Sequence, residues 1–236
     1  MKVEIWSDVV CPWCYIGKRR FESALARFGH RAEVELVWRS FELDPHAPRE
    51  RDVDAAEHLA TKYGMSREKA LASQARLTDL GVQDGLEFRF DISRSGNTFD
   101  AHRLLHLALD RGLQDAAKER LFRAYFTEGE PIGNAEALVR LLAEVGIAEA
   151  DSRAVLESDQ YADAVRADEA EARELGISGV PFFVIDRRYG VSGAQPADAL
   201  LQVLDQAWAE SHPTPQLIAV GAAASDTTCT DETCAI

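Results

Sequence analysis

A short apolar strand that runs directly into two closely spaced cysteines is the feature that most constrains this fold. Residues 3–6 form the strand, and Cys-Pro-Trp-Cys follows at residues 11–14. An amphipathic run over residues 16–28 then predicts a helix that begins at the motif, where proline is well tolerated in the first turn. A strand, a Cys-x-x-Cys pair and a helix in this order indicate a redox-active pair of thiols.

The two cysteines are expected to have different roles. The positive end of the helix dipole favours an anion, so we expect the Cys11 thiol to ionise below its free pKa of about 8.5 and to be the nucleophile. Cys14 lies one turn further into the helix, where it can attack a mixed disulfide formed on Cys11. The alternatives are half of a zinc site, or two small buried residues without a chemical role.

A second stretch far along the chain strengthens the redox interpretation. Gly-Val-Pro-Phe-Phe at residues 179–183 places a proline just before a β-run. With the cysteine motif, it makes residues 1–210 resemble the thioredoxin superfamily, within it the DsbA-like group that includes FrnE-type proteins and 2-hydroxychromene-2-carboxylate isomerases. Further matching pieces are Ser-Asp before the motif, Gly17 after it, Asn-Thr and Ala-His-Arg-Leu at residues 97–104, and Ser-Gly-Ala-Gln at residues 192–195.

The resemblance implies a substrate-binding surface around the cysteines. The Val180–Pro181 bond would be cis, which turns the Val180 backbone toward a bound chain and places Pro181 against the thiols. Trp13 stands where DsbA has histidine, and a neutral indole stabilises a thiolate less than imidazolium does, so we expect a weaker oxidant. Asn97 and Thr98 face the reactive centre in relatives and are assigned to the same surface, although both also suit a helix cap.

The pattern of the whole chain predicts an α/β thioredoxin fold with a large inserted all-helical domain. Alternating charged and apolar residues at 33–38 predict a second strand that completes a βαβ unit. Strands over residues 182–185 and 189–192 and a helix over residues 196–210 would complete the sheet. We divide the chain into an N-terminal part of this fold at residues 1–44, a helical insertion at 45–174, a C-terminal part at 175–210 and a flexible tail at 211–236.

The tail ends in a second pair of cysteines, Cys229 and Cys234. Its low hydrophobicity after Val220 predicts a mobile extension. Roughly twenty residues separate the last helix from Cys229 and span about 25 Å as a coil or about 70 Å extended, against a domain radius of gyration of about 18 Å. We therefore expect a second redox pair that exchanges with Cys11 and Cys14; a dispensable tail, or a zinc site shared by all four thiols, are the alternatives.

Composition limits the classes of partner. A net charge of −14 opposes binding to nucleic acid or to an anionic membrane surface. No run of about 18 apolar residues is present, and the first strand leaves no room for a signal peptide, so we expect a cytoplasmic protein. In a reducing cytosol four cysteines suit exchange better than permanent disulfides. We expect no metal or cofactor, and protein or small-molecule thiols and disulfides as partners.

Two classes of enzyme fit this site. The first is a thiol-disulfide oxidoreductase or disulfide isomerase acting on proteins. The second is a glutathione-dependent isomerase or transferase of the 2-hydroxychromene-2-carboxylate isomerase or kappa class, with glutathione as substrate; these relatives typically have serine at the first motif position. The presence of both Cys11 and Cys14 favours redox chemistry, and a metal-sequestering protein is a third, non-enzymatic class.

One expected group is missing from the predicted strand. Many thioredoxin-like enzymes carry a buried carboxylate six residues before the first cysteine, and this chain has Ile5 there. Glu4 should point to the opposite face, so the proton of Cys14 would need water or another group. His102 and His106 lie four residues apart on a predicted helix, but without an intervening glutamate we interpret them as structural rather than metal-binding.

Overall fold

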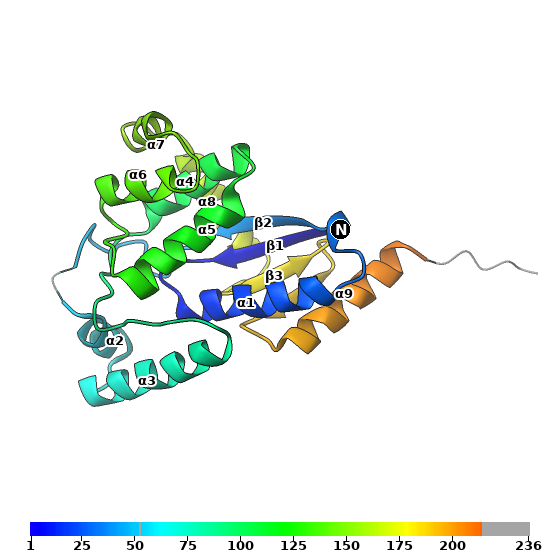
Figure 1. Cartoon of the computed structure of the whole chain (residues 1–236), viewed down its shortest axis with the longest axis horizontal. Coiled ribbons are helices and arrows are strands. Elements are labelled where there is room, and N and C mark those ends of the chain that lie inside the picture. The colour runs from blue at the N-terminus through cyan, green and yellow to red at the C-terminus, as the bar shows by residue number, and fades with distance from the viewer. Residues whose placement is uncertain (52, 214–236) are drawn as a thin grey trace, which may run out of the picture.

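The computed structural model describes residues 1–51 and 53–213, which contain one mixed sheet in the order β2-β1-β3-β4 (Figure 1). Strands β1 (Lys2–Ser7) and β2 (Glu35–Ser40) are parallel and are joined by helix α1 (Pro12–Arg27), which is the predicted βαβ unit. Strand β3 (Phe182–Ile185) runs antiparallel to β1, and β4 (Tyr189–Ser192) forms the edge. The predicted α/β class is confirmed.

Alternation along β1 gives the sheet two apolar faces. Val3 and Ile5 are fully buried on one face, which α1 and α9 (Ala197–Ser211) cover. Trp6 points to the other face and packs against Val184 and Ala172. Successive side chains on a strand point to opposite faces of the sheet, so the strand leading to the cysteines is buried on both sides.

A block of helices separates β2 from β3, as predicted. Helices α4 to α8 gather beside the sheet, and the α2–α3 hairpin lies near the beginning of α1 (Figure 1). The helices are α2 (Ala55–Tyr63), α3 (Arg67–Gln83), α4 (Phe99–Asp110), α5 (Gln114–Arg123), α6 (Ala135–Ala143), α7 (Glu149–Leu156) and α8 (Ala162–Glu174). The division of the chain into domains at residues 45 and 174 stays a prediction.

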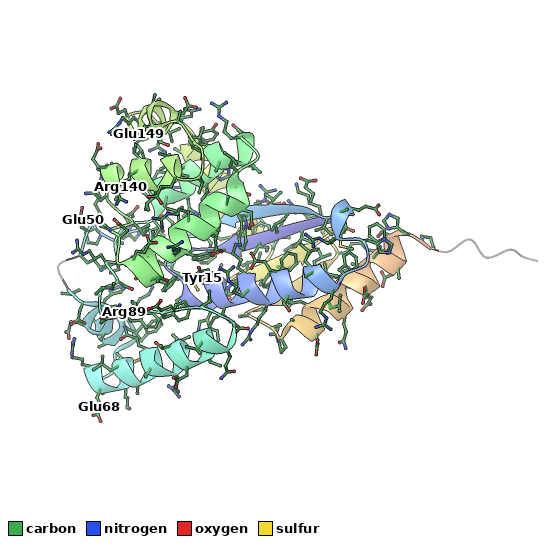
Figure 2. All side chains as sticks on the ribbon, in the orientation of Figure 1. Tyr15, Glu50, Glu68, Arg89, Arg140 and Glu149 are labelled. Carbon is green, nitrogen blue, oxygen red and sulfur yellow. The ribbon has the colours of Figure 1, made fainter. Side chains whose placement is uncertain are left out.

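Helix α1 packs against α5 of this block. Tyr15 lies between the two helices (Figure 2). Its ring stacks on that of Phe122, with 4.8 Å between the ring centres, and its hydroxyl donates to Glu119 Oε1 at 2.8 Å. Cys11 and Cys14 belong to the same apolar cluster. The Cys-Pro-Trp-Cys motif therefore lies where the βαβ unit meets the helical block, and α5 contacts α1 there by stacking and by a polar contact.

Element boundaries differ from the prediction by a few residues. The second strand begins at Glu35 because Arg31–Glu33 form a 3-10 turn, and the last helix ends at Ser211. Within the described part of the chain, none of the helices has the combination of length and apolar character needed to cross a membrane. The second cysteine pair, Cys229 and Cys234, lies outside the described residues.

Candidate functional site

The two motif cysteines occupy the start of α1. Cys11 is the N-cap in an extended conformation (φ −92°, ψ 112°), and Pro12 is the first helical residue. Both thiols are free. Cys11 retains 4% of its accessible surface and Cys14 none, so the first thiol is the one that an incoming disulfide can reach.

The loop before β3 lies directly opposite Cys11. The Val180–Pro181 bond is cis, as predicted, and the Cys11 thiol donates to the Val180 carbonyl oxygen at 3.6 Å. Gly17 permits this approach, because a Cβ at that position would lie 3.0 Å from Pro181 Cγ. Trp13, within the motif, has 43% of its surface exposed. The cis-proline loop and the exposed indole therefore lie next to the Cys11 sulfur.

The expectation that the Cys11 thiol ionises easily is wrong for this arrangement. Its pKa is raised well above the ordinary value, first by hydrogen bonding to the Cys14 side chain, then by burial and by negative charge at Cys14 and Asp8. Only the backbone N–H of Cys14 acts in the opposite direction. Adjacent thiols titrate as a coupled pair, so the helix start alone does not determine the charge on Cys11.

Three buried polar side chains surround the base of the motif. Asp8 Oδ2 accepts from the Leu43 N–H at 2.8 Å, and Asp8 Oδ1 lies 3.4 Å from His102 Nε2. Burial opposes ionisation of Asp8, but contact with His102 and the Leu43 N–H lowers its pKa overall, while burial lowers the pKa of His102. Lys118 of α5 is fully buried and donates to the Ser7 carbonyl at 3.2 Å. Sequence reasoning missed Lys118, because a lysine on a polar helix usually faces solvent.

The histidine pair is not arranged as a metal site. His102 faces Asp8, whereas His106 Nε2 lies 3.1 Å from Asp168 Oδ2 and 3.2 Å from Ser40 Oγ. Across the residues that the structure describes, no three histidine, cysteine, aspartate or glutamate side chains gather as potential ligands. The two histidines connect α4 to different neighbouring segments, which agrees with a structural role.

Asn97 and Thr98 are placed differently from each other. Asn97 Oδ1 accepts from the Phe99 N–H at 2.9 Å, and its amide donates to the carbonyls of Pro45 and Ala47 at 3.3 Å. Asn97 therefore ties the start of α4 to the preceding loop. Thr98 is buried, makes no capping hydrogen bond and lines a cavity beside the motif. Its role in substrate binding stays a prediction.

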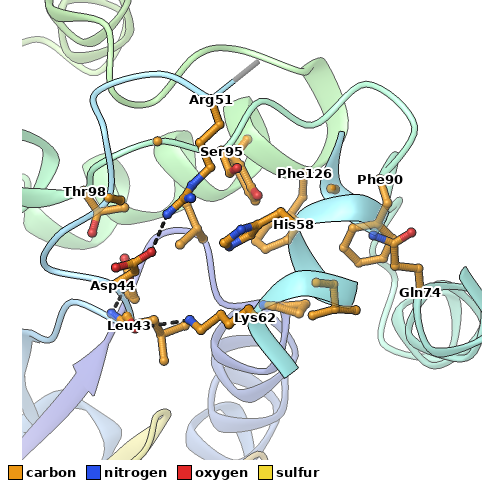
Figure 3. Close-up of a pocket in the computed structure, with 18 of the residues that line it drawn as sticks. Leu43, Asp44, Arg51, His58, Lys62, Gln74, Phe90, Ser95, Thr98 and Phe126 are labelled. Atoms are coloured by element: carbon orange, nitrogen blue, oxygen red, sulfur yellow. Dashed lines mark hydrogen bonds and ion pairs between the residues drawn. The ribbon is translucent and has the colours of Figure 1, made fainter. Parts of the chain in front are cut away.

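That cavity, of about 140 Å³, opens between Pro12 and the α2–α3 hairpin (Figure 3). Much of its wall is apolar, with Phe90 at one side. Arg51, His58 and Lys62 extend into the same region; Arg51 pairs with Asp44, and Lys62 donates to the Leu43 carbonyl at 3.2 Å. The sequence did not indicate this cavity, because its lining comes from segments distant along the chain.

Comparisons with known proteins agree with this geometry. A model of the DSBA-like thioredoxin domain matches residues 2–205. A crystal structure of a probable DsbA oxidoreductase from Streptomyces coelicolor is 49% identical, covers 93% of this chain and 94% of that one, and has a TM-score of 0.86. An uncharacterized Bacillus subtilis protein, YwbO, is 29% identical over 185 residues, which are 78% of this chain and 86% of that protein. The cytosolic disulfide reductase DsbM from Pseudomonas aeruginosa, solved with GSH, is 18% identical, with a TM-score of 0.62 over 87% of this chain and 98% of that one.

Proposed function

Because this chain belongs to the family of DsbA-like thioredoxin domains, we propose that it is a thiol-disulfide oxidoreductase acting through Cys11 and Cys14. The observation that carries the proposal is the position of the Cys11 sulfur, at a helix start and 3.6 Å from the Val180 carbonyl, with a second free thiol directly behind it. A nucleophile that a disulfide can reach, with a resolving thiol behind it, is the arrangement that disulfide exchange requires.

The reaction takes place in two exchanges. Cys11 first gives its proton to water, and its thiolate attacks one sulfur of a client disulfide. A Cys11–client bond forms, and the other client sulfur leaves as a thiolate that takes up a proton. Cys14 then attacks Cys11, which forms the Cys11–Cys14 disulfide and releases the second client thiolate. The client gains two electrons and the protein loses them; small-molecule thiols can return the protein to its dithiol form, and the reverse sequence oxidises a client dithiol.

The client surface consists of Trp13, the Val180 backbone and Pro181. An exposed indole beside the reactive thiol suits an apolar or mixed segment of an extended polypeptide. Release of the client from Cys11 without net oxidation would give disulfide isomerisation at the same site. A cytoplasmic location, expected from the sequence, belongs to the same proposal.

The tail cysteines extend this proposal. Cys229 and Cys234 would act as a second redox pair that reduces the Cys11–Cys14 disulfide or resolves adducts on Cys11. The support is the sequence itself, which has two thiols near the end of an extension long enough to reach the motif.

Reduction of insulin disulfides, followed by precipitation of the B chain in the presence of a small-molecule thiol, tests the function. Wild-type protein should accelerate precipitation, and Cys11→Ser should not. Equal rates for the wild type, the variant and a reaction without protein would contradict the proposal.

A glutathione-dependent enzyme is the second candidate, favoured by the cavity beside Pro12. Arg51 and Lys62 could attract the carboxylates of glutathione there, and the apolar wall could accommodate a small organic substrate. Formation of glutathione conjugates, measured on the same preparation, distinguishes the two candidates. Conjugate formation that persists in Cys14→Ser, without insulin reduction by the wild type, would favour this second function.

A further inference from the structure

Lys118 is buried without the ion pairs that buried lysines usually need. Its side chain is fully inaccessible, and its Nζ donates to the Ser7 carbonyl at 3.2 Å. The same Nζ lies 5.5 Å from the ring centre of Trp38 and 5.1 Å from that of Phe122. Among the salt bridges of the described residues, none involves Lys118, so in this part of the chain no carboxylate contacts its ammonium group.

A second buried lysine in the same region shows the usual arrangement. Lys18 of α1 is 2% exposed, but it contacts three carboxylates: Glu22, Asp115 at 3.4 Å and Glu119 at 3.0 Å. The chain thus provides a matched pair, one buried lysine neutralised by carboxylates and one that is not. Of these two lysines, Lys118 is the one whose charge has no carboxylate partner among the described residues.

The position of Lys118 relates it to the thiols. Ser7, which accepts its hydrogen bond, is the last residue of β1, just before the turn that leads to Cys11. Phe122, one turn later on α5, stacks on Tyr15, the residue after Cys14. The ammonium group therefore lies close to the segment that carries Cys11 and Cys14, and both cysteines affect its pKa.

The sheet itself offers Cys14 no carboxylate. Ile5 is fully buried in the core, and Glu4 is bound by Arg39 and Arg187. The ionisable groups around Lys118 come from three other segments: Cys11, Cys14 and Lys18 of α1, Asp8 before it, and His102 of α4. Of these, Asp8 is held as an anion by its own partners.

We propose that Lys118 is the proton acceptor for Cys14 when Cys14 resolves a mixed disulfide on Cys11. This inference rests on the proposed function. The neutral amine takes the Cys14 proton and becomes an ammonium; the resulting thiolate attacks Cys11, the Cys11–Cys14 bond forms, and the client leaves as a thiolate. In the opposite direction, Lys118 returns the proton to Cys14 as the protein disulfide is reduced.

The ionisation of Lys118 agrees with this role. Burial lowers its pKa to about 8, while negative charge at Cys14, Asp8 and Cys11 raises it, in that order of importance. A group with a pKa close to the working pH can both accept and donate a proton. After burial, Cys14 has the largest effect on the pKa of Lys118.

A chromogenic aromatic disulfide separates the two steps. Mixed with reduced full-length protein carrying Cys229→Ser and Cys234→Ser, it should release one coloured thiolate as Cys11 attacks and a second as Cys14 resolves. Lys118→Met should slow the second release by about 100-fold, the scale of a lost general base, and change the first release much less. In the wild type, the second rate should rise with pH through an inflection near 8, and Lys118→Met should lose that inflection.

Lys18→Met is the matched control, since it removes the other buried lysine but should retain both releases. A second release from Lys118→Met at the wild-type rate and with the wild-type pH profile would overturn the inference. Absence of any second release from the wild type would instead refute the proposed function, so the two failures are distinguishable.

A measurement that leaves Lys118 in place covers the case in which Lys118→Met does not fold. NMR of protein labelled at the lysine ε-carbons should show one titration near pH 8. In Cys14→Ser this titration should move to lower pH, because Cys14 raises the pKa of Lys118 in the wild type. An unchanged titration would contradict the coupling between Lys118 and Cys14.

Discussion

Replacing Lys118 by methionine is expected to stabilise the protein at pH 7, although the side chain is completely buried. Burial lowers the pKa of this lysine from its ordinary value of 10.5 to about 8. At pH 7 the folded protein must therefore hold a charge that the unfolded chain keeps in water at much lower free energy. Methionine has a similar unbranched stem and fills the space without that charge.

The magnitude follows from the two pKa values. At about 1.4 kcal/mol per pH unit, a lysine pKa of about 8 rather than 10.5 lowers the free energy of unfolding at pH 7 by about 3 kcal/mol. Loss of the hydrogen bond to the Ser7 carbonyl offsets about 1 kcal/mol, which leaves a net gain of about 2 kcal/mol for the variant. Between pH 8 and 10.5 the unfolded chain binds more protons than the folded protein, so the free energy of unfolding of the wild type increases as the pH rises. The stability difference between Lys118→Met and the wild type therefore decreases over this range.

Urea unfolding of both proteins under reducing conditions, at pH 7 and at pH 10, measures this difference. Lys18→Met is the control: it removes a cation from three carboxylates, of which Glu22 and Glu119 keep only Arg19, and should lose stability at pH 7. If Lys118→Met were less stable than the wild type at pH 7, or if the difference between them were the same at both pH values, the reasoning would be refuted.

Two further predictions concern the cis-proline loop and the tail. Gly17→Ala should lower the free energy of unfolding by about 1 kcal/mol, because overpacking against Pro181 exceeds the gain in helix propensity. The same variant should slow insulin reduction. Gly29→Ala is the control: no atom lies within 4 Å of the added Cβ, so neither urea unfolding nor activity should change. Deleting residues 225–236 should lower multiple-turnover rates with disulfide substrates but should not change the single-turnover rate at Cys11. Unchanged multiple turnover, together with no crosslink between Cys11 and the tail in mass spectra, would leave the tail pair without a role.

Local patterns were sufficient to predict the strands and the cysteine geometry. The runs at residues 182–185 and 189–192 are strands with those boundaries, and Cys11 lies at the helix start that Pro12 indicated. These features depend on alternation and on residues adjacent in sequence, which a single chain displays directly.

The environment of the thiols could not be predicted in the same way. Lys118 and the carbonyl that it contacts are 111 residues apart, and nothing in the helix around Lys118 distinguishes it from a solvent-exposed lysine. The raised pKa of Cys11 has a similar origin. The argument from the helix start treats one exposed thiol in isolation, whereas packing buries it beside Cys14 and near Asp8.

The most direct test of the central claim is the intact mass of two single-cysteine variants of the motif. Full-length Cys14→Ser and Cys11→Ser, each also carrying Cys229→Ser and Cys234→Ser, are incubated with a peptide that contains a disulfide. If Cys11 is the nucleophile and Cys14 the resolving thiol, Cys14→Ser gains the mass of one thiol fragment on Cys11, and Cys11→Ser gains none. An adduct on Cys11→Ser alone would reverse the two roles, and no adduct on either variant would contradict disulfide exchange at this site.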